Sequence, residues 1–300
     1  MPLRTTPKRM IRVGTRQSAL AMAQTASVVD ALRAAWPTLE ITLVPMISEG
    51  DTTARPFGEI AGEGLFTSRL EQALLDETID VAVHSLKDLP TQLAGGLTIF
   101  AFPPRADAAD LLVGLPERRL GAGCRIGTSS PRRASLLQAS YPGVQILPLR
   151  GNVETRLKRL QQGACDATVL AAAGIGRLGL EVEGERLSPQ HFIPAVGQGI
   201  LAIEGREEKA LQELFAPLDD KPTRRAALAE RAFLRRMGGG CKTPMGAYAR
   251  QAGDGLTLDA FVAEEDGSQL IRIRQSGIGE PAELGRQAAE HLLKKRDGNA

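Results

Sequence analysis

The feature that most constrains the fold is that the chain repeats part of itself. Residues 13–15, Val-Gly-Thr, are followed by serine and arginine residues and then a helical pattern, and residues 126–128, Ile-Gly-Thr, are followed in the same way. Farther on, a helical pattern leads into the apolar segment 80–83, as another leads into 166–170. Strands that alternate with helices predict the parallel sheets of an α/β fold. The repeat therefore predicts two domains of one architecture that face each other across a cleft.

Hydrophobic periodicity supplies the expected elements. In the repeated part, the expected strands are 10–14, 41–46, 79–83, 97–102, 144–149, 166–170 and 200–204. The expected helices there are 19–36, 66–76, 131–140, one around 157–160, and 207–215. Strand 200–204 is expected to return to the first domain, so that two crossing segments act as a hinge.

A third unit is expected after a linker at Pro217 and Pro222. Its expected elements are a helix over 223–237, alternating segments at 245–250, 256–263 and 269–277, and a closing helix over 281–295. This order predicts a small α+β domain with an antiparallel sheet. A chain of 300 residues is long enough for three domains. We expect the first domain to comprise 1–103 and 198–217, the second 104–197, and the third 218–300.

A cluster of charged residues marks a candidate site where the strand over 79–83 should end. His84, Ser85, Lys87 and Asp88 lie together there, and Pro90 prevents the strand from continuing. Ligands of open α/β sheets bind at the carboxyl ends of the strands, so a carboxylate beside an ammonium and an imidazole suggests a site. The alternative is a solvated turn with a chance charge pair.

A long connection without periodicity covers residues 48–64, and it contains four glycines and mixed charge. Loops of this length inside a compact domain are often functional. We expect this loop to act as a flexible lid, and it leads directly to Phe66.

Basic residues are concentrated between Arg125 and Arg177. This segment holds two acidic residues, Glu154 and Asp166, against eight basic ones, namely Arg125, Arg132, Arg133, Arg150, Arg156, Lys158, Arg159 and Arg177. Several of the arginines lie at expected strand-to-helix junctions, as Arg16 does ahead of the candidate N-cap Ser18. Helix N-termini and planar guanidinium groups favour anions and pair carboxylates. Nucleic acid is a poorer match, because aromatic stacking partners are scarce; a small polyanion in a cleft fits better.

Other classes of protein are disfavoured. The three cysteines are far apart and the three histidines do not cluster, so we expect no metal site, no disulfide framework and a reducing compartment. No apolar run approaches the ~20 residues that span a bilayer, and no signal-peptide pattern is present, so a cytoplasmic protein without membrane contact is expected. Residues 174–179 fit G-x-G-x-x-G, but the sequence after them lacks a crossover helix, which argues against a nicotinamide site.

Three glycines precede Cys241, so this thiol should lie in an exposed, adaptable loop. Lys242 beside it favours the thiolate, which is the reactive form of cysteine. The alternative is a glycine turn with an incidental cysteine.

The chain resembles the porphobilinogen deaminase family, also called hydroxymethylbilane synthase, over nearly its whole length. The resemblance rests on stretches in the family's order, at residues 15–18 (TRQS), 64–66 (GLF), 84–90 (HSLKDLP), 127–133 (GTSSPRR), 149–153 (LRGNV), 194–199 (PAVGQG) and 239–241 (GGC). It implies two domains like those of periplasmic binding proteins, with an interdomain cleft, plus a small C-terminal α+β domain.

The resemblance also implies an activity. Members of the family are transferases of porphyrin, tetrapyrrole and heme biosynthesis that join four porphobilinogen molecules head to tail and release ammonia each time. The chain grows on a covalent dipyrromethane, one per protein, and is then hydrolysed off as hydroxymethylbilane. By the match, Asp88 is the catalytic aspartate and Cys241 carries the cofactor through a thioether.

Further residues are implied to bind the cofactor or substrate. They are Arg16, Ser18, Phe66, Ser85, Lys87, Thr128, Ser129, Ser130, Arg132, Arg133, Arg150, Arg156, Arg177 and Gln198. The chain departs from the family at Glu59 and Glu63, where lysine occurs in some relatives, and at Pro131, where leucine is frequent. The two glutamates put a direct role of the loop in carboxylate binding in doubt.

The chemistry implied by the family agrees with the residues. Each pyrrole carries acetate and propionate arms, so a growing chain is a small polyanion that the arginines can hold. Loss of ammonia leaves a cationic azafulvene that the Asp88 carboxylate can stabilise. The family further implies a monomer that passes its product to uroporphyrinogen-III synthase. The main alternative is a non-enzymatic two-domain anion-binding or effector-binding protein, which leaves Cys241 and the third domain unexplained.

Overall fold

The structure is a computed structural model that describes residues 10–47, 67–238 and 243–298. The chain divides into two compact units. The first comprises Met1–Arg105 and Ile200–Arg224, and the second Ala106–Gly199 and Arg225–Ala300. None of the helices in the described ranges has the length and apolar character needed to cross a membrane.

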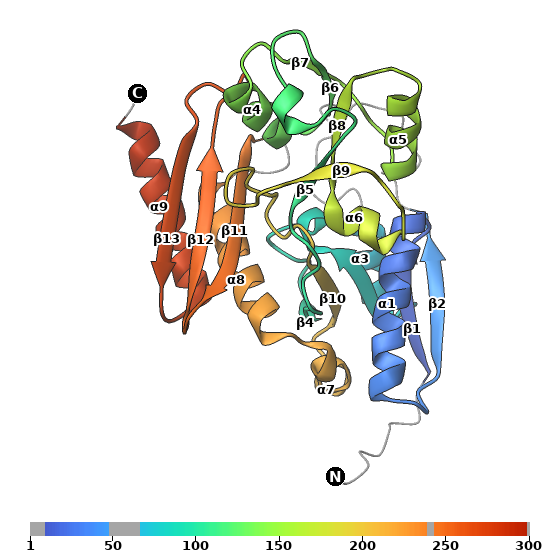
Figure 1. Cartoon of the computed structure of the whole chain (residues 1–300). Helices are drawn as coiled ribbons and strands as arrows, with labels where there is room; N and C mark the ends of the chain where they lie inside the picture. Colours follow the sequence, from blue (N-terminus) through green and yellow to red (C-terminus); the bar gives the residue numbers. More distant parts are fainter. Residues whose placement is uncertain (1–9, 48–66, 239–242, 299–300) are drawn as a thin grey trace. The chain divides into compact units, whose positions relative to one another are not determined.

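The first unit contains a five-stranded mixed sheet in the order β2-β1-β3-β10-β4 (Figure 1). Its strands are β1 (Ile11–Arg16), β2 (Ile41–Met46), β3 (Val81–Ser85), β4 (Leu97–Ala101) and β10 (Leu201–Arg206). Strands β1, β2 and β3 are parallel, whereas β10 runs antiparallel to both β3 and β4. The predicted return of the chain to the first sheet is therefore confirmed.

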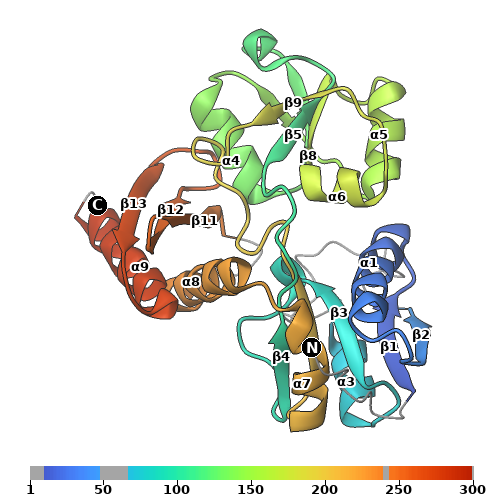
Figure 2. The same ribbon diagram turned by 60° about the horizontal axis from the view of Figure 1, so that its bottom comes forward.

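Helices cover both faces of this sheet. On one face α1 (Ala19–Ala35) and α7 (Lys209–Phe215) pack their apolar side chains on β1, β3 and β10. On the other face α3 (Ser68–Leu75) packs on β3 and β4 (Figure 2). Burial of these aliphatic side chains contributes about 1.5–3 kcal/mol for each fully buried one.

The second unit contains a sheet of the same kind in the order β7-β6-β8-β5-β9. Its strands are β5 (Asp110–Val113), β6 (Arg125–Gly127), β7 (Gln145–Leu147), β8 (Ala167–Ala171) and β9 (Gly184–Leu187). Strands β6, β7 and β8 are parallel and β5 is antiparallel to β8, as β10 is to β3 in the first sheet. The predicted repeat of one α/β architecture is confirmed.

The helices of this sheet are α4 (Pro131–Ser140), α5 (Val153–Gln161) and α6 (Ala172–Arg177). Leucines of α4 pack on one face, while α5 and α6 contribute to a separate cluster with Val113 and Leu170. Helix α6 begins directly after β8 and contains Gly174 and Gly176. The G-x-G-x-x-G sequence thus lacks the glycine turn between strand and helix that dinucleotide binding requires.

The C-terminal part is an antiparallel sheet with two long helices, as predicted. It is formed by β11 (Met245–Ala252), β12 (Gly255–Val262) and β13 (Ile271–Gly277), with α8 (Lys221–Met237) and α9 (Pro281–Asp297). Apolar residues of α8 and α9 share a core with the sheet. Phe261 of β12 packs instead in the core cluster of the second sheet, and both sheets are parts of one compact unit.

The structure corrects three expectations about elements. Strands β5 and β9 were not predicted. Strand β3 extends to Ser85, so His84 and Ser85 belong to the strand and not to the turn after it. The expected linker at Pro217 and Pro222 is structured, because Pro217 lies in a short 3₁₀ helix (Ala216–Leu218) and Pro222 in the first turn of α8. Proline is tolerated there because its missing N–H would have no helical partner.

Candidate functional site

Asp88 lies on a short, firmly anchored turn at the end of β3. Residues Leu86–Asp88 form a 3₁₀ helix, in which the leucine at 86 is buried, as is Leu89 directly after the turn, while Lys87 and Asp88 are exposed. The backbone N–H of Leu86 donates to Ile200 O at 2.9 Å, and that of Leu89 donates to Leu86 O at 3.2 Å. The two buried leucines and the hydrogen bond to Ile200 therefore fix the backbone of the turn. The Asp88 carboxylate and the Lys87 ammonium project outward from it.

The imidazole of His84 does not join this pair, which corrects the expectation from sequence. Its side chain is buried, and its Nε2 lies 3.0 Å from Oε2 of the buried Glu204. Ser85, the next residue, exchanges hydrogen bonds with the Gln24 amide of α1, at 2.9 and 3.2 Å. His84 and Ser85 therefore contact the body of the unit, whereas Lys87 and Asp88 face outward.

Arg16 and Ser18 lie at the same edge of the first sheet as the Asp88 turn. Strands β1 and β3 are parallel and directly paired, so their carboxyl ends meet at one edge. Ser18 caps α1, since its Oγ accepts a hydrogen bond from Ala21 N at 3.4 Å, as the sequence predicted. The edge thus combines a helix N-terminus, a guanidinium, a carboxylate and an ammonium.

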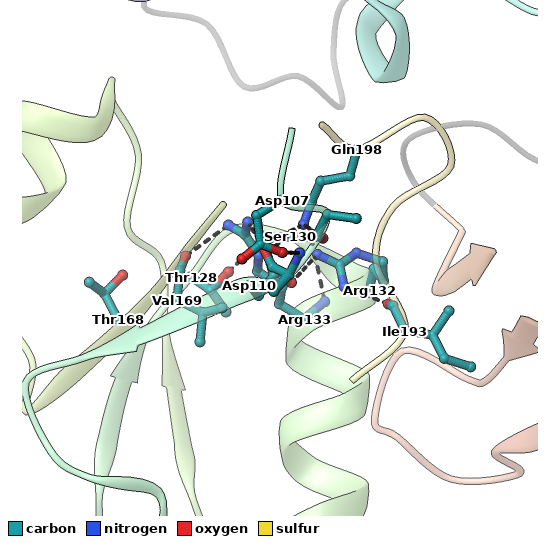
Figure 3. A network of polar contacts seen from close by, with 12 residues as sticks. Asp107, Asp110, Thr128, Ser130, Arg132, Arg133, Thr168, Val169, Ile193 and Gln198 are labelled. Atoms are coloured by element: carbon teal, nitrogen blue, oxygen red, sulfur yellow. Dashed lines mark hydrogen bonds and ion pairs between the residues drawn. The ribbon is translucent and has the colours of Figure 1, made fainter. Parts of the chain in front are cut away.

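In the second unit, Arg132 and Arg133 in the first turn of α4 form a buried network with Asp110 of β5 (Figure 3). The two oxygens of Asp110 accept from Arg132 at 2.6 Å and from Arg133 at 2.7 Å. Arg132 also donates to Ile193 O, and Arg133 to Val169 O. Both guanidiniums are therefore held rigidly, and their positions are set by an acid that the sequence reasoning did not single out.

Gln198 belongs to this network as well. Its buried amide donates to Asp110 Oδ1 at 2.9 Å and to Ala108 O at 2.8 Å. Burial opposes the ionisation of Asp110, but the two arginine charges outweigh it and lower the pKa of that carboxyl below its ordinary value. Burial lowers the pKa of Arg132 despite the attraction of Asp110.

The other predicted binding residues of this unit lie at the carboxyl edge of the second sheet. Thr128 is buried, Ser129 is exposed, and Ser130 caps α4 by accepting from Arg133 N at 3.4 Å. Arg150 is exposed after β7, Arg156 is in the first turns of α5, and Arg177 ends α6. Because β6, β7 and β8 are parallel, their carboxyl ends place these residues at one edge.

Two of these arginines are partly buried without a carboxylate. Burial and the nearby charge of Arg133 lower the pKa of Arg156 to about 10, and burial lowers the pKa of Arg177. Their side chains donate only to backbone oxygens within the described residues, those of Gly151 and Gly199. The buried Arg133 Nε likewise has no hydrogen-bond partner in the ranges that the structure describes. Buried cations without counter-charges fit a ligand that carries several carboxylates.

Two predicted site residues lie outside the described residues. They are Phe66 and Cys241, and the same holds for the loop over 48–64 with its glutamates. Three buried polar residues that contact predicted site residues or the strand leading to Asp88 were missed from sequence, namely Asp110, Glu204 and Gln24. A signal existed for Asp110, because an acid directly before the apolar run 111–113 is unusual for a buried strand.

The chain matches two domain models of one protein family. Residues 11–213 match the model "Porphobilinogen deaminase, dipyromethane cofactor binding domain", and residues 225–294 match "Porphobilinogen deaminase, C-terminal domain". The chain belongs to the porphobilinogen deaminase family. The porphobilinogen deaminase of Roseiflexus castenholzii is 46% identical over 289 residues, which are 94% of this chain and 95% of that protein. That of Desulforudis audaxviator is 44% identical over 298 residues, covering 97% and 96%.

Membership of the porphobilinogen deaminase family makes the chain a transferase of tetrapyrrole synthesis with a dipyrromethane cofactor. It also decides against a purely anion-binding protein, because the match includes the C-terminal domain. Among solved structures, the BenM effector-binding domain with benzoate covers 71% of this chain and 91% of its own, at 14% identity and a TM-score of 0.43. A TM-score this low adds nothing to the family assignment.

Proposed function

We propose that the protein is hydroxymethylbilane synthase. It condenses four porphobilinogen molecules head to tail on a bound dipyrromethane, with loss of one ammonia each time, and releases hydroxymethylbilane by hydrolysis. The observation that carries this proposal is the exposed Asp88 carboxylate on its anchored turn, in a chain of the porphobilinogen deaminase family.

Asp88 is the proposed catalytic residue. A substrate that has lost ammonia is cationic, and a carboxylate held on a fixed backbone stabilises that charge without rearrangement. The same carboxylate can accept a hydrogen bond from a pyrrole N–H and move protons. General acid–base assistance of this kind contributes about 10²–10⁴ in rate. Lys87 beside it, and Arg16 and Ser18 at the same sheet edge, would bind substrate carboxylates.

The arginines of the second unit are the proposed holders of the pyrrole carboxylates. Arg156 and Arg177 lack acidic partners among the described residues, and Arg133 retains a free buried N–H. Arg132, Arg150 and Gln198, with the hydroxyls of residues 128–130, would complete the binding surface. The dipyrromethane supplies the primer on which the pyrrole chain grows, which makes each condensation effectively intramolecular.

Other features of the proposal follow the family. Cys241 would carry the primer through a thioether, and Phe66 would stack on a pyrrole. We place the three domains at 1–103 with 198–217, 104–197 and 218–300. The protein would be a cytoplasmic monomer whose product passes to uroporphyrinogen-III synthase.

The proposal is tested by Asp88→Asn, which removes the charge and keeps the shape. We expect turnover to fall by about 10²–10⁴-fold, because the carboxylate is lost from the reaction. Porphobilinogen consumption by the purified variant is the measurement. Asp30→Asn on α1 is the control, because Asp30 is exposed and forms a loose contact at 3.9 Å with the likewise exposed Arg33. Wild-type turnover in Asp88→Asn would remove this residue from the mechanism.

Intact mass tests the primer separately. The purified wild-type protein should carry a covalent dipyrromethane, and peptide mapping should place the added mass on Cys241. Cys241→Ala should lack it. A fully active wild-type protein with no added mass would overturn the proposal.

A further inference from the structure

Two buried titratable side chains and a third that is partly buried form a cluster near the Asp88 turn, and the proposed chemistry uses none of them. They are Glu71 of α3, His84 of β3 and Glu204 of β10. Ala202 of β10 is paired with His84, and Glu204 follows two residues later. Because side chains alternate along a strand, His84 and Glu204 project from the same face of the sheet. That face is the one on which α3 packs.

The members of the cluster depend on one another for polar contacts. Glu204 is 0% exposed and His84 5% exposed, and the ion pair at 3.0 Å is the polar contact of their side chains among the described residues. Apart from this contact, neither Glu204 oxygen nor His84 Nε2 nor the buried Glu71 Oε1 has a hydrogen-bond partner in the described part of the chain. Burial raises the pKa of Glu71, the charge of Glu204 raises it further, and His84 lowers it. Buried polar groups with so few hydrogen bonds destabilise the folded state, so their presence calls for an explanation.

Metal binding does not explain the cluster. In the part of the chain that the structure describes, no group of three or more such side chains has the arrangement of a metal site. The other charged groups nearby lie at the opposite end of these strands, where Asp80, directly before β3, pairs with both Arg12 and Arg206 of β10. They do not neutralise Glu204.

The backbone connects the cluster to the candidate catalytic turn. Ser85 pairs with Leu201, and the next residue, Leu86, donates to Ile200 O. The strands β3 and β10 are thus held together up to the first residue of the 3₁₀ helix that carries Asp88. The contact between His84 and Glu204 joins side chains of the same two strands, and His84 is only four residues before Asp88 in the chain.

We propose that His84 and Glu204 are positioning residues, whose buried ion pair, with Glu71 beside it, holds the end of β3 against β10 and so fixes the Asp88 turn for reaction. This inference rests on the proposed function of Asp88. Neither residue touches the substrate; they act through the backbone of the turn. Loss of either side chain would leave the other buried without its polar partner, and the local backbone would shift to let water reach the remaining group.

The test compares His84→Asn, Glu204→Gln and the double variant in the full-length protein. Each single variant should keep its primer by intact mass and its KM for porphobilinogen, while kcat falls by about 10–100-fold, as for small misplacements of reacting groups. The thermal midpoint should fall in both. Glu207→Gln, an exposed acid just after β10, is the matched control and should leave kcat unchanged.

The double variant separates positioning from plain stability. It has no unpaired buried charge, so its thermal midpoint should recover toward that of the wild type. If the ion pair positions the turn, kcat stays low despite this recovery. Wild-type kcat in either single variant, or recovery of both kcat and midpoint in the double variant, would overturn the inference. If the single variants fail to fold, the double variant alone decides.

The outcome is distinguishable from failure of the proposed function. That function fails if the wild-type protein carries no primer or if Asp88→Asn is fully active. The positioning inference fails when a primer-loaded His84→Asn or Glu204→Gln protein, in which Asp88 is intact, turns over like the wild type.

Discussion

At the scale of single residues, one buried carboxylate organises the anion-binding side of the molecule. Asp110 accepts from both guanidiniums at the start of α4 and from the Gln198 amide (Figure 3). The two arginines were predictable from the sequence as ligands of an anion. Their shared internal partner was not, because Asp110 lies on β5, a short strand without a local sequence pattern.

Asp110→Asn should lower the free energy of unfolding at pH 7 by about 3–5 kcal/mol, because two buried guanidiniums lose their counter-charge. The arginines lower the pKa of Asp110, so the stability that its charge contributes is full above the unfolded-state pKa of about 3.9 and is lost as the pH falls below it. The difference from the wild type should therefore shrink in acid. Urea unfolding at pH 7 and about pH 3 measures this, and a pH-independent difference would contradict it.

At the scale of elements, the periodic helices and the long strands were predictable and the short strands were not. Helix α4 begins at Pro131 and ends at Ser140 as expected, because proline and a serine cap mark its start. Strand β9, Gly184–Leu187, begins with glycine and charged residues and forms at the sheet edge through pairing with β5. Such a strand is defined by a distant partner, which local periodicity does not reveal.

The Asp88 turn illustrates how an element holds a site. Leu86, 2% exposed, anchors it. Leu86→Ala should reduce the free energy of unfolding by about 2–5 kcal/mol, the usual cost of a cavity in a core. Leu75→Ala on α3 is the control, since Leu75 is 42% exposed and should cost far less. Chemical denaturation of both variants gives the comparison, and equal effects would mean that the turn is not anchored by Leu86.

At the scale of the whole molecule, each α/β sheet contains a strand that follows the passage of the chain from the other unit. Strand β5 follows the passage from the first unit into the second, and β10 follows the passage back. The repeat in the sequence predicted the α/β architecture that the two sheets share. Phe66, Cys241 and the loop over 48–64 lie outside the described residues, so their predicted roles stay predictions.

The first unit should therefore fail to fold from residues 1–105 alone, because β10 lies between β3 and β4. Joining residue 105 to residue 200 by a short Gly-Ser linker should restore folding. The link is short enough, because the next residues, Ala106 and Gly199, are hydrogen bonded at 3.1 Å. Circular dichroism of both polypeptides is the measurement. A folded 1–105 fragment would show that β10 is dispensable.

The position of β10 also sets an order of events on the ribosome. The second sheet is built from consecutive residues, 110–187, whereas the first sheet lacks an inner strand until residues 201–206 emerge. At roughly 5–20 residues per second, the half-made sheet waits about 5–20 s for the intervening ~100 residues. During translation the N-terminal part of this protein is therefore the later one to mature, and its unpaired β3 and β4 edges are the surfaces that a chaperone would need to shield.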